Sequence, residues 1–242
     1  MAATREPAEG RKTRARRGAK DSGEGGSSPR RAALVAIAAE LFAERGYKAT
    51  TVREIGDAAG VLSGSLYHHF GSKEEILDEL LSSYMSSLDG TYREIIEAGA
   101  GPDETLCKLV AAAFESLAQH RAAITVLQNE REYLAQIPRF GYLDKIEDDV
   151  RRQWVGVIEH GVRDGVFRSA TDPELTYRFL RDSVWVAVRW YRPDGPMTAD
   201  QVAERYLGLV MDGLREPGSA GAAKAGKAAP KKTAAKRPAA KK

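Results

Sequence analysis

The chain has little of what marks secreted, membrane-spanning or disulfide-stabilised proteins. Only one of its 242 residues, Cys107, is a cysteine, so no disulfide can form within the chain, and the sequence predicts the reducing cytoplasm. It has no run of 18 apolar residues, which argues against a membrane-spanning helix. Its basic N-terminal residues lack the apolar segment of a secretory signal. Cys107 lies among apolar residues at helical spacing, where we expect a small buried hydrophobic group.

The chain also lacks residue sets typical of catalysis or metal binding. We find no nucleophile with a base, no phosphate-cradling glycine loop and no cluster of metal ligands, so an enzyme is the least favoured class, and we predict no cofactor. His68 and His69 are adjacent, but neighbours on a helix point about 100° apart, and no cysteine or carboxylate pattern accompanies them. We interpret Glu147, Asp148 and Asp149 as a solvated helix face.

The overall charge of the chain hides an asymmetry. The net charge is +3 for the whole chain, +3 for residues 1–29 and +8 for residues 217–242, which leaves −8 for residues 30–216. Residues 1–28 lack large apolar side chains and are predicted to be a disordered basic arm, which could follow DNA or be a solvated leader. Residues 217–242 are predicted to be a disordered Lys/Ala/Pro-rich tail, either a DNA tether or a solubilising segment.

A pair of short helices is predicted near residue 60. Thr51 and Glu54 form a capping box for the first helix, and Gly60 stands where a residue of positive φ ends a helix. Ser63 is expected to cap the second helix, which carries small and polar residues on its outer face. Two short helices joined by a glycine-containing turn predict a helix-turn-helix, whose second helix enters a DNA major groove.

The remaining sequence predicts further helices and no sheet. Apolar residues recur at helical spacing, and no segment alternates with a period of two, so we predict an all-α fold of about nine helices. We expect a helix-turn-helix DNA-binding domain at residues 29–76 and a helical ligand-binding and dimerisation domain at 77–216. The last two helices are predicted at 173–191 and 199–215.

The stretch between Leu34 and Leu80 resembles the TetR family of bacterial transcriptional regulators. The resemblance lies in LFAERGYKATTV, REIGDAAGV and GSLYHHFGSKEEIL. It implies a repressor that binds a double-stranded, near-palindromic operator as a homodimer, with the last two helices forming the interface between subunits. Residues matching family positions that touch phosphates are Thr51, Tyr67, His68 and Lys73. Ser63, Gly64 and Ser65 begin the second short helix and are candidates for contacts with base edges.

An unusual row of basic residues crosses the predicted helix at 173–191. Steps of three and four residues place these side chains on one face: Arg178, Arg181, Trp185, Arg189 and Arg192. Two explanations stay open. The arginines could pair with acids such as Asp148, Asp149 or Asp182, or they could form the wall of a pocket for an anionic ligand.

The stretches PRFGYLDK at 138–145 and YRFLRDSVWVAVRWYRPDGPMTADQV at 177–202 resemble the TetR-type repressors of late steroid (cholesterol ring C/D) catabolism. That resemblance implies a coenzyme A thioester of a steroid-degradation intermediate as the inducer, and the residues that suit it are Arg181, Trp185 and Arg189. Two alternatives remain: a regulator that responds to another lipid or a drug, and a nucleoid-associated protein whose basic tails dominate DNA binding.

Overall fold

The computed structural model describes residues 28–217 of the chain, and the fold over this range is all-helical, as predicted. Ten α-helices and one 3-10 turn follow in order: α1 (Pro29–Arg45), α2 (Val52–Ala58), α3 (Ser63–Leu66), α4 (Lys73–Glu97), α5 (Pro102–Gln119), α6 (Arg121–Asn129), α7 (Arg131–Leu134), η1 (Pro138–Phe140), α8 (Tyr142–Arg163), α9 (Pro173–Ala187) and α10 (Ala199–Leu214). The basic arm and most of the Lys/Ala/Pro-rich tail lie outside the described residues.

Side-chain caps fix where several helices begin. Ser28 accepts a hydrogen bond from the Arg31 N–H at the start of α1, with Pro29 in the first helical position. Ser72 does the same for α4, and Thr198 with Gln201 forms a complete capping box for α10. These local signals are visible in the sequence, and the start of α10 at Ala199 confirms the start predicted for the last helix.

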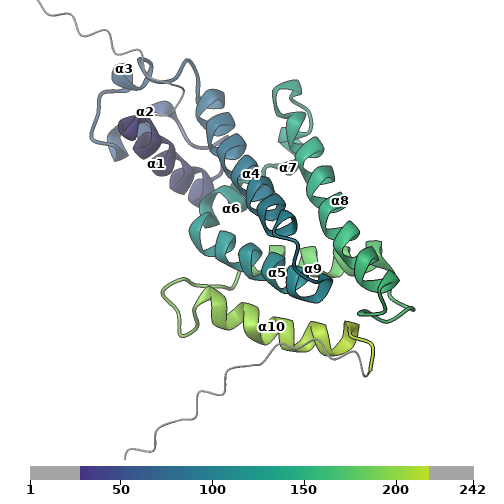
Figure 1. The fold of residues 1–242 in the computed structure, drawn as a ribbon. Helices are drawn as coiled ribbons and strands as arrows, with labels where there is room; N and C mark the ends of the chain where they lie inside the picture. Colours follow the sequence, from purple (N-terminus) through teal and green to yellow (C-terminus); the bar gives the residue numbers. More distant parts are fainter. Residues whose placement is uncertain (1–27, 218–242) are drawn as a thin grey trace, which may run out of the picture.

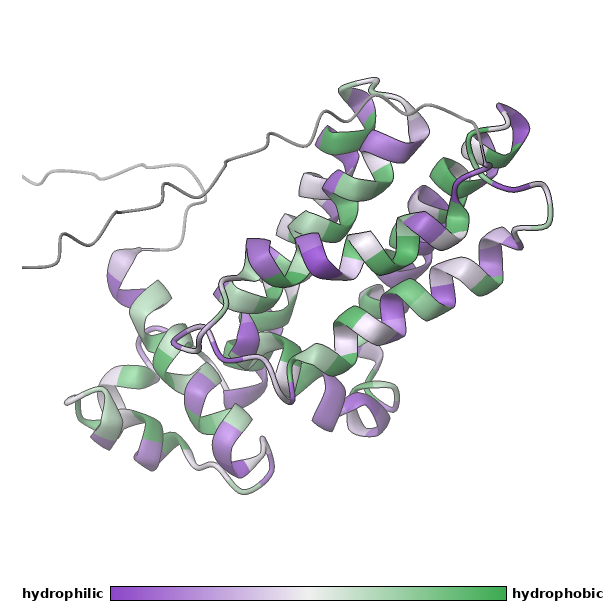
Figure 2. Ribbon diagram, turned by 90° about the horizontal axis from the view of Figure 1, so that it is seen from below, coloured by the Kyte–Doolittle hydropathy of each residue, from purple (hydrophilic) through white to green (hydrophobic). Residues whose placement is uncertain are grey.

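The helices are arranged around the long helix α4. Figure 1 shows α1, α2 and α3 together at one end of the molecule, while α10 lies toward the opposite end. α4 packs against α1 at that first end and against α5 and α8 further along, and α10 packs against α5. The helices carry both hydrophobic and hydrophilic residues along their length (Figure 2), as is usual for amphipathic helices that pack one face against the core. A displacement of α4 would therefore change its contacts with α1 and also its contacts with α5 and α8.

The predicted helix at 173–191 was too long, because α9 ends at Ala187. Two side chains from α6 bind carbonyls at its C-terminal end: Arg121 donates to the Val188 carbonyl, at 3.2 and 3.3 Å, and Gln128 donates to the Trp185 carbonyl at 2.8 Å. The chain then continues through tight turns. The arginine row is thereby interrupted, and Arg189 and Arg192 do not continue the face of α9.

The C-terminal end of α10 is joined to the turn between α8 and α9. The Arg168 N–H donates to the Leu214 carbonyl at 2.9 Å, and Phe167 forms an isolated bridge with Arg215. The Phe167 ring is fully buried against Gly161, where an added Cβ would lie 2.2 Å from it. Gly161 therefore makes room for the ring that anchors this end of the molecule.

None of the helices within residues 28–217 is long and apolar enough to cross a membrane. Over the same range, no group of three or more His, Cys, Asp or Glu side chains is placed to hold a metal ion.

Candidate nucleic-acid interface and ligand cavity

The predicted helix-turn-helix is formed by α2 and α3. The Thr51 hydroxyl accepts the Glu54 N–H at 3.2 Å, and a Glu54 carboxylate oxygen accepts the Thr51 N–H at 2.8 Å. Gly60 has φ +65°, a conformation that favours glycine, and it turns the chain toward α3. The Thr51 hydroxyl also donates to Glu54, so a phosphate contact by this hydroxyl would compete with the cap.

The second short helix is held by two apolar anchors and presents its polar residues outward. Leu66 and Phe70 are buried, with 1% and 2% of their surface exposed. The predicted DNA-contacting residues that are exposed or half-buried on this helix and just after it are Ser63, Gly64, Ser65, Tyr67 and His68. The structure therefore leaves these candidates for base and phosphate contact at least partly accessible on one short segment.

Ser63 does not cap α3, contrary to the prediction. It is the first helical residue, and Leu62 occupies the cap position without a side-chain hydrogen bond. The turn that begins at Gly60 places the start of α3 at Ser63, one residue earlier than a cap at Ser63 would. The Ser63 hydroxyl is consequently not spent on capping.

Lys73 lies at the start of α4 and holds the turn between α1 and α2. Its ammonium donates to the carbonyls of Tyr47 and Thr50, both at 2.7 Å, and lies 4.3 Å from the centre of the Tyr47 ring. Burial lowers the pKa of this lysine. A phosphate contact by Lys73 would have to compete with these two carbonyls.

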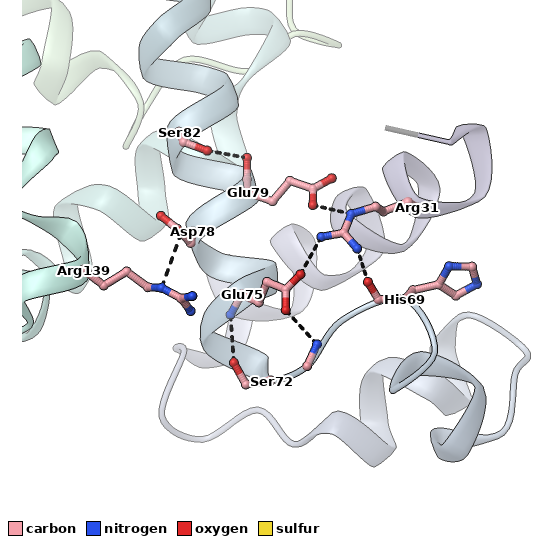
Figure 3. A network of polar contacts seen from close by, with 9 residues as sticks. Arg31, His69, Ser72, Glu75, Asp78, Glu79, Ser82 and Arg139 are labelled. Atoms are coloured by element: carbon pink, nitrogen blue, oxygen red, sulfur yellow. Dashed lines mark hydrogen bonds and ion pairs between the residues drawn. The ribbon is translucent and has the colours of Figure 1, made fainter. Parts of the chain in front are cut away.

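A network of polar contacts connects this end of the molecule to α4 (Figure 3). The Arg31 guanidinium of α1 lies between Glu75, at 2.8 Å, and Glu79, at 2.5 Å, and also donates to the His69 carbonyl just after α3. Its Cζ lies 4.1 Å from the centre of the Phe70 ring. One side chain thus holds α1, the end of the α3 region and α4 together.

The opposite side of α4 is bound by the segment that leads into α8. Arg139 of η1 pairs with Asp78 at 3.6 Å, and the Tyr142 hydroxyl donates to the Asp78 carbonyl at 3.4 Å. Figure 3 shows Arg139 and Arg31 approaching α4 from different sides. Asp78 and Glu79 are neighbours, so the two sets of contacts meet within one turn of the helix.

A cavity of about 680 Å³ lies among α4, α5, α6, α7, α8 and α9. Part of its lining is apolar or aromatic: Tyr84, Met85, Leu88, Tyr92, Leu117, Ile124 and Trp154. Burial raises the pKa of Tyr84 to about 12, so its hydroxyl stays protonated. The buried indole N–H of Trp154 has no hydrogen-bond partner among the described residues. The cavity therefore has the size and polarity of a site for an organic molecule.

The charged part of the lining consists of three arginines, each already paired, and four carboxylates: Asp144, Glu147, Asp148 and Asp182. Arg131 makes a two-pronged contact with Glu147, at 3.0 and 2.8 Å, and Arg181 lies 2.7 Å from Asp182. Arg151, the third lining arginine, pairs with Glu174 at 2.6 Å, outside the lining. An anionic ligand would have to replace these carboxylates rather than meet an unpaired cation.

The structure places two of the three predicted ligand residues in the lining. Arg181 and Trp185 line the cavity from α9, whereas Arg189 follows the end of that helix and does not. Glu147 was predicted to lie on a solvated helix face, but it lines the cavity together with Asp148. Asp149 pairs with Arg152 on the exposed side of α8.

Comparison with known proteins agrees with this arrangement. Residues 34–80 match the family of bacterial regulatory proteins called tetR, and residues 99–214 match the tetracyclin repressor-like C-terminal domain. The HTH-type transcriptional repressor KstR2 of Rhodococcus jostii (strain RHA1) is 52% identical over 79% of this chain and 94% of its own length. The chain belongs to the TetR family. Like KstR2, this TetR-family chain is a transcriptional regulator with a helix-turn-helix.

Two further comparisons concern KstR2 of Mycobacterium tuberculosis. In strain H37Rv its sequence is 49% identical over 78% of this chain and 94% of its own length. A solved structure, described as the ketosteroid transcriptional regulator KstR2, superposes with a TM-score of 0.75 at 49% identity, over 77% of this chain and 95% of that one. The TetR fold thus extends over both the helix-turn-helix and the helices around the cavity.

Proposed function

We propose that this TetR-family regulator is a repressor that binds a palindromic operator as a homodimer and is released by an acyl-CoA from steroid degradation. The observation that carries the proposal is the cavity that contains Arg181 and Trp185. It lies against α4, which also packs on α1 beside the helix-turn-helix. A ligand that prefers one position of α4 would release DNA by the difference in its affinity for the two states.

The cavity chemistry supports a ligand with an apolar ring system and an anionic part. The aromatic lining suits a hydrophobic body, and the buried N–H of Trp154 would be satisfied by a carbonyl oxygen. Arg181 could exchange Asp182 for a phosphate of the CoA group. We propose that Arg181 and Trp185 bind this ligand from the lining of the cavity. We propose that Arg189, which does not line the cavity of a single chain, binds it as well.

Exposed apolar side chains support the proposed homodimer. They lie along α9, just after it, and on α10: Leu175, Phe179, Val186, Trp190 and Leu209. Leu209 has 82% of its surface exposed and Phe179 has 65%. Burial of these groups against a second copy would stabilise a dimer with two helix-turn-helix units.

The proposed DNA contacts follow from the exposed edge of α3 and its surroundings. Base edges would be contacted by Ser63, Gly64 and Ser65, and phosphates by Thr51, Tyr67, His68 and Lys73. We assign DNA binding to residues 29–76 and ligand binding with dimerisation to residues 77–216. A regulator of this kind would act in the cytoplasm, where the bacterial chromosome lies.

The proposal is tested with a DNA fragment from upstream of the protein's own coding sequence. Fluorescence anisotropy would be measured in excess unrelated DNA, with and without a bicyclic steroid-derived acyl-CoA, for the full chain and for a chain lacking residues 217–242. We expect saturable binding that survives the truncation and weakens at least tenfold with the acyl-CoA. Arg181→Met should bind the fragment normally but resist release.

Other outcomes would contradict the proposal in distinct ways. Binding that ignores sequence and disappears with residues 217–242 would favour a nucleoid-associated protein. Sequence-dependent binding that responds to a different lipid or a drug, and not to the acyl-CoA, would leave a regulator with another ligand.

A further inference from the structure

Leu62 is the most exposed large apolar residue in the described part of the chain. Its exposed fraction is 84%, although it lies within one turn of the buried Leu66 and directly after Val61, which packs against the core. The backbone at Leu62 is extended, with φ −65° and ψ 141°. The isobutyl group therefore projects from the tip of the helix-turn-helix.

The local structure favours a different residue at this position. Leu62 is the cap residue of α3, where Ser, Thr, Asp or Asn would accept a hydrogen bond from the helix and stabilise it. Leucine forfeits that bond and also exposes apolar surface to water. Neither folding nor solvation accounts for leucine here.

Gly64, two residues later, has no role in the fold either. Its φ is not positive, and a Cβ added to it would meet nothing within 4 Å. Glycine inside a helix is less stable than alanine, because the unfolded chain loses more conformational freedom. Two residues on one short segment are thus unfavourable for the isolated protein, which is common where a surface serves binding.

The charge around Leu62 indicates the kind of partner. The sequence has no carboxylate between Asp57 and Glu74, although residues 30–216 carry a net charge of −8. The large side chains exposed in this interval are Leu62, Tyr67 and His68, and Ser63 and Ser65 beside them are half-buried. A surface with apolar and hydroxyl groups but no acid suits a DNA major groove, where a thymine presents its C5-methyl group between two rows of phosphates.

We infer that Leu62 reads a thymine of the operator through contact with its C5-methyl group, while Gly64 lets the backbone approach the base edges. The inference rests on the proposed sequence-specific binding of an operator, and it adds a residue that determines which base is accepted. Ser63 and Ser65 would donate hydrogen bonds beside this apolar contact. Leu62→Ser would therefore improve the helix cap and weaken base recognition at the same time.

The test begins with a DNA duplex selected by the full chain from a random-sequence pool. Each thymine of the selected duplex is then replaced in turn by deoxyuridine, which lacks only the methyl group. Affinities would be measured for the parent protein, for Leu62→Ser and for Leu62→Met as the matched apolar control. Thermal unfolding of each protein, and of Gly64→Ala, would be recorded without DNA.

We expect one thymine position, repeated in the two half-sites, at which deoxyuridine weakens binding of the parent protein. The loss should be about fourfold per half-site, which corresponds to one lost methyl contact. Leu62→Met should keep most of this discrimination and Leu62→Ser should lose it. Leu62→Ser and Gly64→Ala should unfold at equal or higher temperature than the parent while binding the duplex more weakly. Weaker DNA binding without loss of thermal stability would show that Leu62 and Gly64 act in base recognition and not in folding.

Two results would overturn the inference. If a sequence is selected but no thymine shows a methyl effect that depends on Leu62, the operator proposal stands and Leu62 has another partner, such as a protein. If no sequence is enriched from the pool, both the operator proposal and this inference fail.

Discussion

His120 lies between α5 and α6, where its ring packs 5.4 Å from the ring of Tyr84. Burial lowers the pKa of this histidine below its ordinary value, so the unfolded chain binds the proton more readily than the folded one. The free energy of unfolding should therefore fall as the pH drops from about 7 to 5, through the ordinary histidine pKa.

Urea unfolding at pH 7.5 and pH 5.5 measures this effect. The His120→Asn variant should lose less stability than the parent over that interval. His68→Asn, a change at an exposed histidine, should retain the full pH dependence. Equal pH dependence in all three proteins would mean that His120 does not contribute.

At the scale of single residues, local features could be predicted from the sequence, and long-range contacts could not. Thr51 with Glu54 and the turn at Gly60 were predicted correctly, because each depends on neighbours within a few positions. Glu147 was misplaced, because its two-pronged contact with Arg131 joins residues that are sixteen positions apart. A carboxylate on a helix can equally face solvent or a cavity, and only the packing of other helices decides which.

At the scale of elements, Arg31 is the contact that joins α1 to α4. Arg31→Ala should reduce the free energy of unfolding by about 1–2 kcal/mol, since charge-assisted hydrogen bonds to two half-buried carboxylates are lost. It should also weaken operator binding, because the carbonyl of His69 after α3 loses its donor. Denaturant unfolding and anisotropy measure the two effects.

The neighbouring Arg30 supplies the matched control for this prediction. Its side chain is exposed, so Arg30→Ala should leave the unfolding free energy within about 0.5 kcal/mol of the parent. Equal losses in the two variants would assign the effect to helix propensity or net charge rather than to the Arg31 network.

The junction of α6 and α7 connects the cavity to the DNA-binding end through two adjacent residues. Glu130 accepts the Tyr47 N–H at 2.9 Å, in the turn between α1 and α2, while Arg131 lines the cavity and pairs with Glu147. Movement of Arg131 toward a ligand would also displace Glu130. Glu130→Ala should therefore reduce the ratio of operator affinities measured without and with ligand.

Glu130→Gln is the control for this prediction, because its amide oxygen can still accept the Tyr47 N–H. It should retain most of the coupling, and both variants should bind ligand alone with similar affinity. If Glu130→Ala released DNA as the parent does, the signal would have to pass through the contacts of Arg139 and Tyr142 with Asp78 instead.

Helix starts were easier to predict than helix ends. The starts of α1, α4 and α10 are set by local caps, whereas the end of α9 depends on Arg121 and Gln128 from a distant segment. The break between α6 and α7 at Glu130 likewise coincides with a long-range contact, the hydrogen bond from the Tyr47 N–H. Such long-range contacts cannot be predicted from the spacing of apolar residues alone.

At the scale of the whole molecule, the exposed side chains of α9 and α10 predict a specific effect on assembly. Phe179→Glu with Leu209→Glu should shift the protein toward monomer, because each carboxylate would be buried in the proposed interface. Sedimentation velocity measures the change, and operator affinity should fall with it. Thr91→Glu, a charge added at an exposed position of α4, should leave the assembly unchanged.

The cavity shows why the candidate ligand site was only partly predictable from the sequence. Arg181 and Trp185 were found because they share one helix face, but Arg131 and Arg151 come from other helices. The lining draws on six helices spread between α4 and α9, so its composition depends on their packing. The resemblance to steroid regulators is the source of the proposed kind of ligand, and the structure shows the carboxylates with which an anionic ligand would compete.

The contacts of Arg31 with Glu75 and Glu79 affect how operator affinity depends on salt concentration. Added salt screens the pairs of Arg31 with Glu75 and Glu79 as well as the contacts between protein and phosphate. The slope of operator affinity against salt concentration would then include loosening of α1 from α4, in addition to the counterions released from DNA. The number of phosphates derived from that slope would be too high for the parent protein.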